Sequence, residues 1–176
     1  MKDPFVIANN VLSIAWNRKI PVYPEKIIKK ILVKDGNNEI QVKLFGNKSK
    51  EFTFNNMRLS STCTYNENDG FFVCNYNIDD NLTRSRFAIT HSLGHICLRH
   101  LKYNKVLYDS EFKNTDKKEL DANIFASIIL MPDDAIHNCI RKLKCNNKNI
   151  IIQKIASLFS VSENAVRFRL KTMNLL

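Results

Sequence analysis

Residues that interrupt regular structure are scarce in this chain, which has only four glycines and four prolines among 176 residues. This scarcity excludes collagen-like and low-complexity chains. Acidic residues are also few, because 17 Asp and Glu stand against 27 Lys and Arg, for a formal net charge of +10. A hydrophobic content of 44% excludes a disordered chain. A length of 176 residues indicates one domain, or one domain with a small appendage.

Paired cysteines and long apolar runs are missing as well. The five cysteines form no C-x-x-C pair and no zinc-knuckle spacing, so we expect reduced, mostly buried thiols. The most apolar stretch, residues 124–131, is far shorter than the roughly 20 residues of a membrane helix. The first residues lack the apolar core of a signal peptide. We therefore expect a cytoplasmic protein with no membrane partner.

The positive charge leaves the kind of partner open. It favours nucleic acid, an anionic surface or an acidic protein. However, Lys, Asn and Ile are abundant throughout the sequence, so the charge also fits a general compositional bias. Composition alone does not decide between these interpretations.

Hydrophobic periodicity predicts helices, then strands, then helices again. Helical spacing of apolar residues predicts the first helices over 5–16 and 24–32. Alternating apolar residues predict a small, mainly antiparallel sheet of three or four strands, around 40–44, 52–54, 62–65 and 71–75. Further helices are expected over 83–101, 117–131, 133–144, 149–159 and 162–173. This order predicts an α+β fold.

The chain is expected to divide into a main domain, 1–145, and a small helical subdomain, 146–176, packed on it. Two short helices with a turn at 161–162 resemble helix-turn-helix patterning. The second of them carries three cationic residues suited to phosphate contacts, Arg167, Arg169 and Lys171. Few of its residues are suited to reading base edges. DNA binding therefore stands beside a packing or partner-binding role for these helices.

Three of the four histidines fall within ten positions, in the segment RSRFAITHSLGHICLRH. His91 and His95 are four residues apart, so on a helix they share one face and can bind one metal ion together. Two packed or solvated histidines would give the same pattern. Glu119 begins the next apolar helix and offers the carboxylate that a two-histidine, one-glutamate site needs. An acidic residue in a first helical turn also stabilises the helix when no metal is bound, so a purely structural role for Glu119 is the alternative.

Three segments together resemble the ImmA/IrrE family of metallo-endopeptidases: FFVCN, RSRFAITHSLGHICLRH and ELDANIFASIILMP. They stand in the family's order and at similar spacing, and the resemblance covers most of the chain. It implies a zincin-like active-site helix pair that holds Zn²⁺ through His91, His95 and Glu119, with helix-turn-helix-like helices at the C-terminal end. It also implies a protein partner, a helix-turn-helix transcriptional repressor that keeps a mobile element or a stress response silent.

Three more residues of these segments lie near the implied ligands. Asn123 follows Glu119 by one helical turn, so it either orients a metal ligand or packs. Asp121 is expected to be solvated. His100 follows His91 by nine positions, which would place it on the opposite face of a continuous helix, in a structural role.

One position departs from the family's pattern. The family's catalytic glutamate directly follows the first histidine, and Ser92 stands there. That glutamate takes a proton from the attacking water and passes it to the leaving amine, whereas a serine hydroxyl has no useful basicity near pH 7. Loss of a general base typically costs about 10²–10⁴ in rate. We therefore expect an inactive or strongly impaired peptidase; the alternatives are a non-enzymatic pseudopeptidase that binds a repressor, and a DNA-binding regulator.

Overall fold

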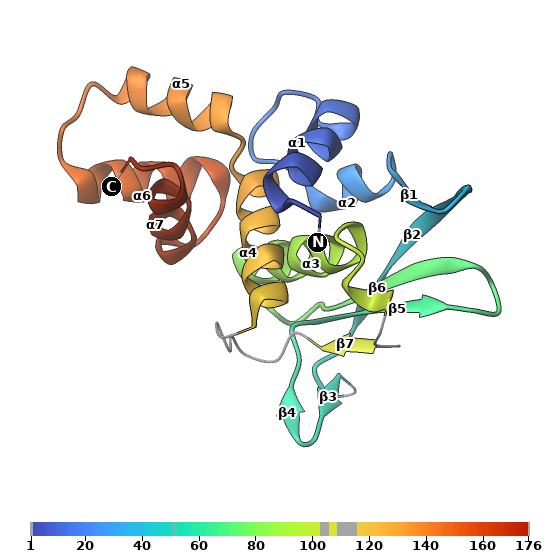
Figure 1. Ribbon diagram of the computed structural model, residues 1–176. Helices are drawn as coiled ribbons and strands as arrows, with labels where there is room; N and C mark the ends of the chain where they lie inside the picture. Colours follow the sequence, from blue (N-terminus) through green and yellow to red (C-terminus); the bar gives the residue numbers. More distant parts are fainter. Residues whose placement is uncertain (1, 51, 103–105, 109–115, 176) are drawn as a thin grey trace.

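The computed structural model describes residues 2–50, 52–102, 106–108 and 116–175. Two helices, α1 (Pro4–Ala15) and α2 (Pro24–Ile28), precede the strands (Figure 1). Five further α-helices follow them in the described residues: α3 (Leu82–Cys97), α4 (Lys117–Leu130), α5 (Asp133–Leu143), α6 (Lys148–Phe159) and α7 (Glu163–Thr172). A short 3-10 helix, η1 (His100–Lys102), comes directly after α3. The α+β fold predicted from the sequence is confirmed.

The main sheet has the strand order β1-β2-β6-β5-β7 in the described residues. Its strands are β1 (Leu32–Asp35), β2 (Asn38–Asn47), β5 (Ser61–Asn66), β6 (Phe71–Asn77) and β7 (Val106–Tyr108). Three of the pairings are antiparallel, and β2 with β6 is parallel. The predicted strand at 52–54 lies outside this sheet, because β3 (Thr53–Phe54) pairs only with β4 (Met57–Arg58). The sheet is thus mainly antiparallel, as predicted, but has more strands.

The second helix is shorter than predicted. It ends at Ile28, and the chain from Leu32 enters strand β1. Gly36 adopts a positive φ of 59°, which lets a two-residue turn fold β1 back onto β2, with Val33 opposite Ile40. Pairing with β2 and burial of Val33 therefore override the helical spacing of the preceding apolar residues.

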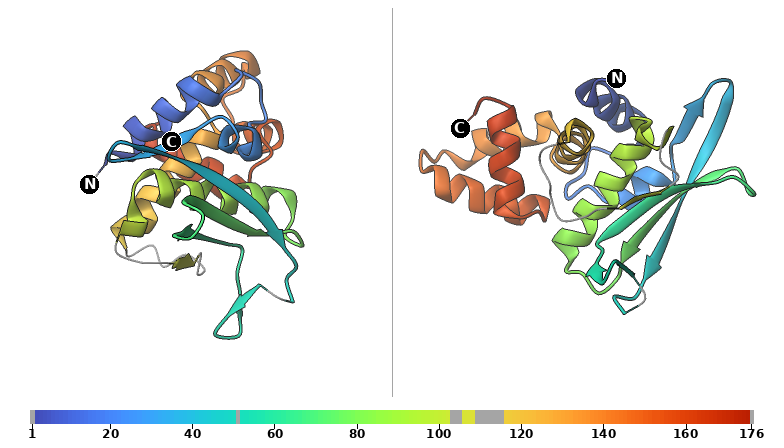
Figure 2. Two further views of the ribbon diagram at one scale, coloured as in Figure 1. Left: turned by 90° about the vertical axis from the view of Figure 1, so that its right-hand side faces the viewer. Right: turned by 60° about the horizontal axis from the view of Figure 1, so that its bottom comes forward.

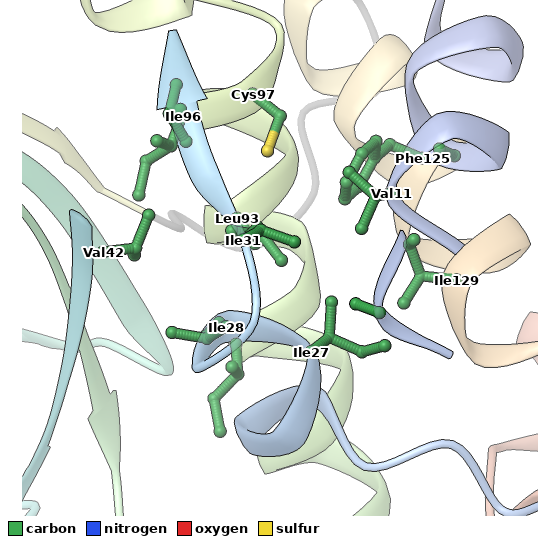
Figure 3. Close-up of a cluster of buried hydrophobic side chains, with 14 of the residues drawn as sticks. Val11, Ile27, Ile28, Ile31, Val42, Leu93, Ile96, Cys97, Phe125 and Ile129 are labelled. Atoms are coloured by element: carbon green, nitrogen blue, oxygen red, sulfur yellow. The ribbon is translucent and has the colours of Figure 1, made fainter. Parts of the chain in front are cut away.

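The principal hydrophobic core lies between the sheet and helices α1 to α4 (Figure 3). Its buried side chains include Val11, Ile27, Val42, Leu93, Phe125 and Ile129. Helices α3 and α4 approach closely at Gly94, where an added Cβ would lie 3.1 Å from the Phe125 ring and 3.3 Å from the Ala122 backbone. The missing side chain at Gly94 thereby sets the spacing between the two helices.

A second core joins the end of α4 to the C-terminal helices, on the side of α4 away from the sheet (Figure 2). It contains residues from both sides of the boundary predicted after residue 145, among them Ile136, Cys139, Ile152 and Val166. The division into two domains stays a prediction. None of the helices in the described residues is both long and apolar enough to cross a membrane.

Two fully buried arginines fasten the C-terminal helices to the rest of the molecule. The Arg86 guanidinium donates to the carbonyl oxygens of Phe159 (2.9 Å) and Ser160 (2.7 Å), between α6 and α7, and to that of Val22. Arg169 on α7 donates to the Met131 carbonyl at 3.2 Å and pairs with the Asp133 carboxylate. Burial lowers the pKa of Arg86, and lowers that of Arg169 to about 10. Each buried cation therefore depends on these acceptors to remain charged.

Candidate metal centre

His91 and His95 project from one face of α3 toward the first turn of α4, which carries Glu119. Their Nε2 atoms lie 2.9 Å apart, and the two carboxylate oxygens of Glu119 lie 3.2 Å and 3.4 Å from them. Asp116 caps α4 by accepting a hydrogen bond from the Lys118 amide, so the helix begins just before the glutamate. The spacing of four residues on α3 and the start of α4 thus bring the three predicted residues together.

This cluster has the dimensions of a metal site. A tetrahedral ion with ligands at about 2.0–2.2 Å holds neighbouring ligand atoms about 3.3–3.6 Å apart. The observed separations of 2.9, 3.2 and 3.4 Å come within a few tenths of an ångström of that range. Both imidazoles are buried, whereas the Glu119 side chain is 25% exposed, which leaves one side of the cluster accessible.

The outer hydrogen bonds of the two histidines prepare their inner nitrogens for a cation. His91 Nδ1 lies 2.9 Å from Asn123 Oδ1, an acceptor, so Nδ1 carries the proton and Nε2 presents a lone pair. His95 Nδ1 lies 3.1 Å from His100 Nδ1, and donation to His100 leaves its Nε2 a lone pair too. Two lone pairs and a carboxylate then converge without a proton between them. Three such donors repel one another unless a positive ion lies among them, so the residues fit a bound metal.

His100 does not lie on the opposite face of α3, as the sequence led us to expect. The helix ends at Cys97, and Arg99 adopts a left-handed backbone with φ 63°, which turns the chain back. His100 therefore packs edge-on against His95, with ring centroids 5.0 Å apart. Burial, and next the neighbouring His95, lower the pKa of His100 to about 4. A neutral His100 can accept the hydrogen bond that orients His95.

Acidification is expected to destabilise the metal-free protein through His100. Because its pKa is about 4 in the folded state and about 6.5 unfolded, the unfolded chain takes up the proton first as the pH falls. The stabilising contribution is complete well above pH 6.5 and is lost as the pH falls toward 4, by about 2 kcal/mol between pH 7 and pH 5. Urea unfolding in EDTA at pH 7 and pH 5 measures this loss. His100→Gln should flatten the pH dependence, and an unchanged slope in that variant would contradict the assignment.

The carboxylates on α4 differ sharply in environment. Burial acts to raise the pKa of Glu119, but His91 and His95, which donate to the carboxylate when the metal-free imidazoles take up a proton at Nε2, outweigh it and hold the pKa below its ordinary value. Asp121, expected to be solvated, is instead buried, and burial raises its pKa. The prediction for Asp121 was wrong because this side of α4 packs against α1. Glu119 thus remains the anionic group of the cluster.

The Ser92 hydroxyl is bound into the interface between α3 and the sheet. It donates to Ser61 Oγ on β5 at 2.8 Å, and Ser61 donates onward to the Ala88 carbonyl at 3.0 Å. It also makes a hydrogen bond with the thiol of Cys74, whose pKa burial raises to about 12. No pattern in the sequence indicated Ser61 or Cys74 as neighbours of Ser92. The hydroxyl therefore links helix to sheet.

A cleft of about 690 Å³ lies beside the cluster, between α3, α4 and the beginning of α7. Asn123, which contacts His91, and Phe87, which stacks on the His91 ring at 6.1 Å, both line it. Opposite them lie Asn164, Ala165 and Phe168 from α7. In a helix-turn-helix protein, the N-terminal residues of the second helix enter the major groove. Here, the corresponding residues of α7 face the protein's own α3 and α4.

Two of the three cationic residues of α7 already pair with acidic side chains of this protein. Arg169, one of the three residues suited to phosphate contacts, is buried and paired with Asp133, so it is not available for such a contact. Arg167 lies 3.8 Å from Glu163 and donates to Asn149 at 3.4 Å. The arrangement of α7 therefore gives little support to DNA binding through this helix.

Comparison with known proteins agrees with the geometry. Residues 53–171 match the profile of a peptidase family, M78, described as the IrrE N-terminal-like domain. The match includes β5, β6, the three clustered residues and the C-terminal helices. A search of curated proteins finds no match for the chain.

Proposed function

Since the chain belongs to the IrrE N-terminal-like peptidase family, we propose that it is a zinc protein that binds a helix-turn-helix transcriptional repressor and cleaves it very slowly or not at all. His91, His95 and Glu119 hold the metal ion, while Asn123 and His100 fix the two imidazole rings. In such a site the ion polarises a substrate carbonyl and lowers the pKa of a bound water. Zinc is the metal of choice because two imidazoles and one carboxylate suit it.

The position of Ser92 carries the proposal of weak or absent cleavage. A hydroxyl that donates to Ser61 and contacts Cys74 lies in the helix–sheet interface and cannot accept a proton near pH 7. Serine in the place of the family's glutamate leaves the three metal-holding residues unchanged. Binding of metal and partner is therefore separable from turnover. All five cysteines carry free thiols, which supports the proposed cytoplasmic location.

A binding experiment with identified repressors tests this function. The purified protein, loaded with zinc, is mixed with each purified helix-turn-helix repressor of its host, and the mixture is analysed by size exclusion and intact-mass spectrometry. We expect one repressor to form a complex and to keep its full mass. Rapid cleavage of that repressor would show an active peptidase, and the absence of a complex with every repressor would refute the proposed partner.

A further inference from the structure

Arg84 is the one ionisable residue among the described residues that line the cleft beside the metal centre. Its side chain is 47% exposed, and the other lining residues are neutral. Several of these are apolar and come from three helices: Phe87, Ala88, Leu120, Ala165 and Phe168. The cleft volume of about 690 Å³ falls in the range typical of ligand sites. The cleft thus combines an apolar surface with one positive charge.

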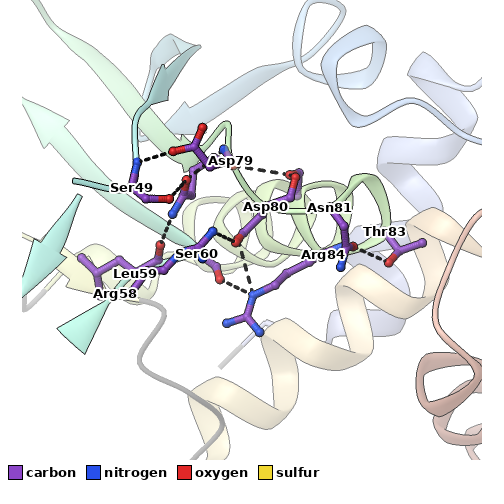
Figure 4. A network of polar contacts seen from close by, with 11 residues as sticks. Ser49, Arg58, Leu59, Ser60, Asp79, Asp80, Asn81, Thr83 and Arg84 are labelled. Atoms are coloured by element: carbon purple, nitrogen blue, oxygen red, sulfur yellow. Dashed lines mark hydrogen bonds and ion pairs between the residues drawn. The ribbon is translucent and has the colours of Figure 1, made fainter. Parts of the chain in front are cut away.

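The guanidinium of Arg84 is held at one edge and open at the other. Its Nε donates to Ser60 Oγ at 2.6 Å and lies 3.4 Å from the Asp80 carboxylate, whose side chain is only 4% exposed. Figure 4 shows the two terminal nitrogens directed away from both partners. Asp80 and Ser60 thus orient the group, and its paired terminal N–H donors are the arrangement that matches a carboxylate.

The helix ends at the cleft strengthen the attraction for a negative charge. The cleft is lined by first-turn residues of both α3 and α7, which are 16 and 10 residues long. The N-terminal end of each helix carries a partial positive charge. The one acid in these two first turns, Glu163, does not line the cleft and pairs with Arg167. The two helix ends therefore add partial positive charge to that of Arg84, which shares the single carboxylate of Asp80 with Arg58.

We propose that this cleft docks an acidic segment of the partner protein, with an Asp or Glu side chain on Arg84 and an adjacent large apolar side chain against Phe87 and Phe168. This inference rests on the proposed function, because it takes the occupant to be part of the bound protein. It extends that function by naming what is recognised. The shared walls, Phe87 and Asn123, place the docked segment directly beside the metal centre.

Two fluorescent peptides test the docking site. One contains a Phe-Leu pair flanked by aspartates, the other has asparagines in their place, and both have amidated C-terminal ends so that only side chains differ. Fluorescence polarisation with the full chain should show the aspartate peptide bound at least about tenfold more tightly, as expected for a charge-assisted pair. Higher salt should narrow the difference. Equal affinities, or no binding of either peptide, would overturn the proposal.

Arg58 provides a matched control for Arg84. It also pairs with Asp80, at 2.6 Å, but it does not line the cleft. Arg84→Gln should therefore abolish the preference for aspartate, whereas Arg58→Gln should retain it while losing a similar ion pair. A preference that survives Arg84→Gln, or tight Arg84-dependent binding of a single-stranded oligonucleotide in place of the peptide, would refute the assignment.

Metal analysis of the same proteins separates this inference from the proposed function. If the aspartate preference is present but the protein holds no zinc, the docking site stands and the zinc function fails. If zinc binds stoichiometrically and the preference is absent, the zinc function stands and the docking site fails.

Discussion

Ser92→Glu is expected to raise peptide hydrolysis by about 10²–10⁴, the usual contribution of a general base. Glutamate at this position would restore a proton acceptor beside the cluster of His91, His95 and Glu119 while leaving the cluster itself unchanged. The longer side chain must leave the contact with Ser61, which we expect to lower stability by about 1–3 kcal/mol. Hydrolysis of a quenched-fluorescent peptide library by the zinc-loaded protein measures the gain.

Ser92→Gln is the matched control for this gain. Glutamine has nearly the same size as glutamate and no basicity, so it reproduces the packing change without the chemistry. We expect it to stay as inactive as the wild type. If the wild type already hydrolyses peptides as fast as Ser92→Glu, serine at this position does not limit the reaction. If Ser92→Glu binds zinc, keeps its fold and remains inactive, the lost base is not the reason for inactivity.

The second large effect is expected from His91→Ala, which should weaken zinc binding by about 10³-fold or more. Loss of a residue that merely orients a ligand costs 10–100-fold in affinity, and loss of the ligand itself exceeds that. At a free zinc concentration of about 1,000 times the wild-type Kd, binding should stabilise the wild type by about 4 kcal/mol and the variant by very little. Competition titration against a chromophoric chelator and thermal unfolding with and without zinc measure both effects.

His137→Ala provides the comparison for this variant. His137 is exposed on α5 and is not part of the cluster, so its loss should leave zinc affinity and zinc-dependent stabilisation unchanged. Zinc stabilisation that disappears in both variants would indicate non-specific binding to surface histidines. Full zinc affinity in His91→Ala would show that His91 does not bind the ion and would refute the proposed metal centre.

The part of the site that could be read from the sequence is the part that depends on short-range spacing. His91 and His95 share a face because an α-helix brings residues four apart together, and Glu119 lies at the start of the following long helix. Asn123, one turn later, follows from the same periodicity. Helical periodicity therefore places these residues on shared helix faces, whereas their assignment as a ligand set came from the resemblance to a peptidase family.

The remaining contacts depend on events that periodicity does not encode. His100 reaches His95 only because Arg99 adopts a positive φ, an uncommon conformation for a residue with a side chain. Ser61 meets Ser92 because β5 packs on α3, a tertiary contact across 31 positions. The stretch from Leu32 became a strand because β2 was available to pair with it. In each case, a partner far along the chain decided the local outcome.

The buried guanidinium of Arg86 has a consequence for the thermodynamics of recognition. It ties the helix that carries His91 to the turn before α7, so both walls of the cleft are fixed before any partner arrives. A segment that docks there does not have to supply the free energy of ordering those walls, and more of the contact energy appears as affinity. The same rigidity narrows the choice of partners, because a cleft with fixed walls accepts only side chains that already fit its width.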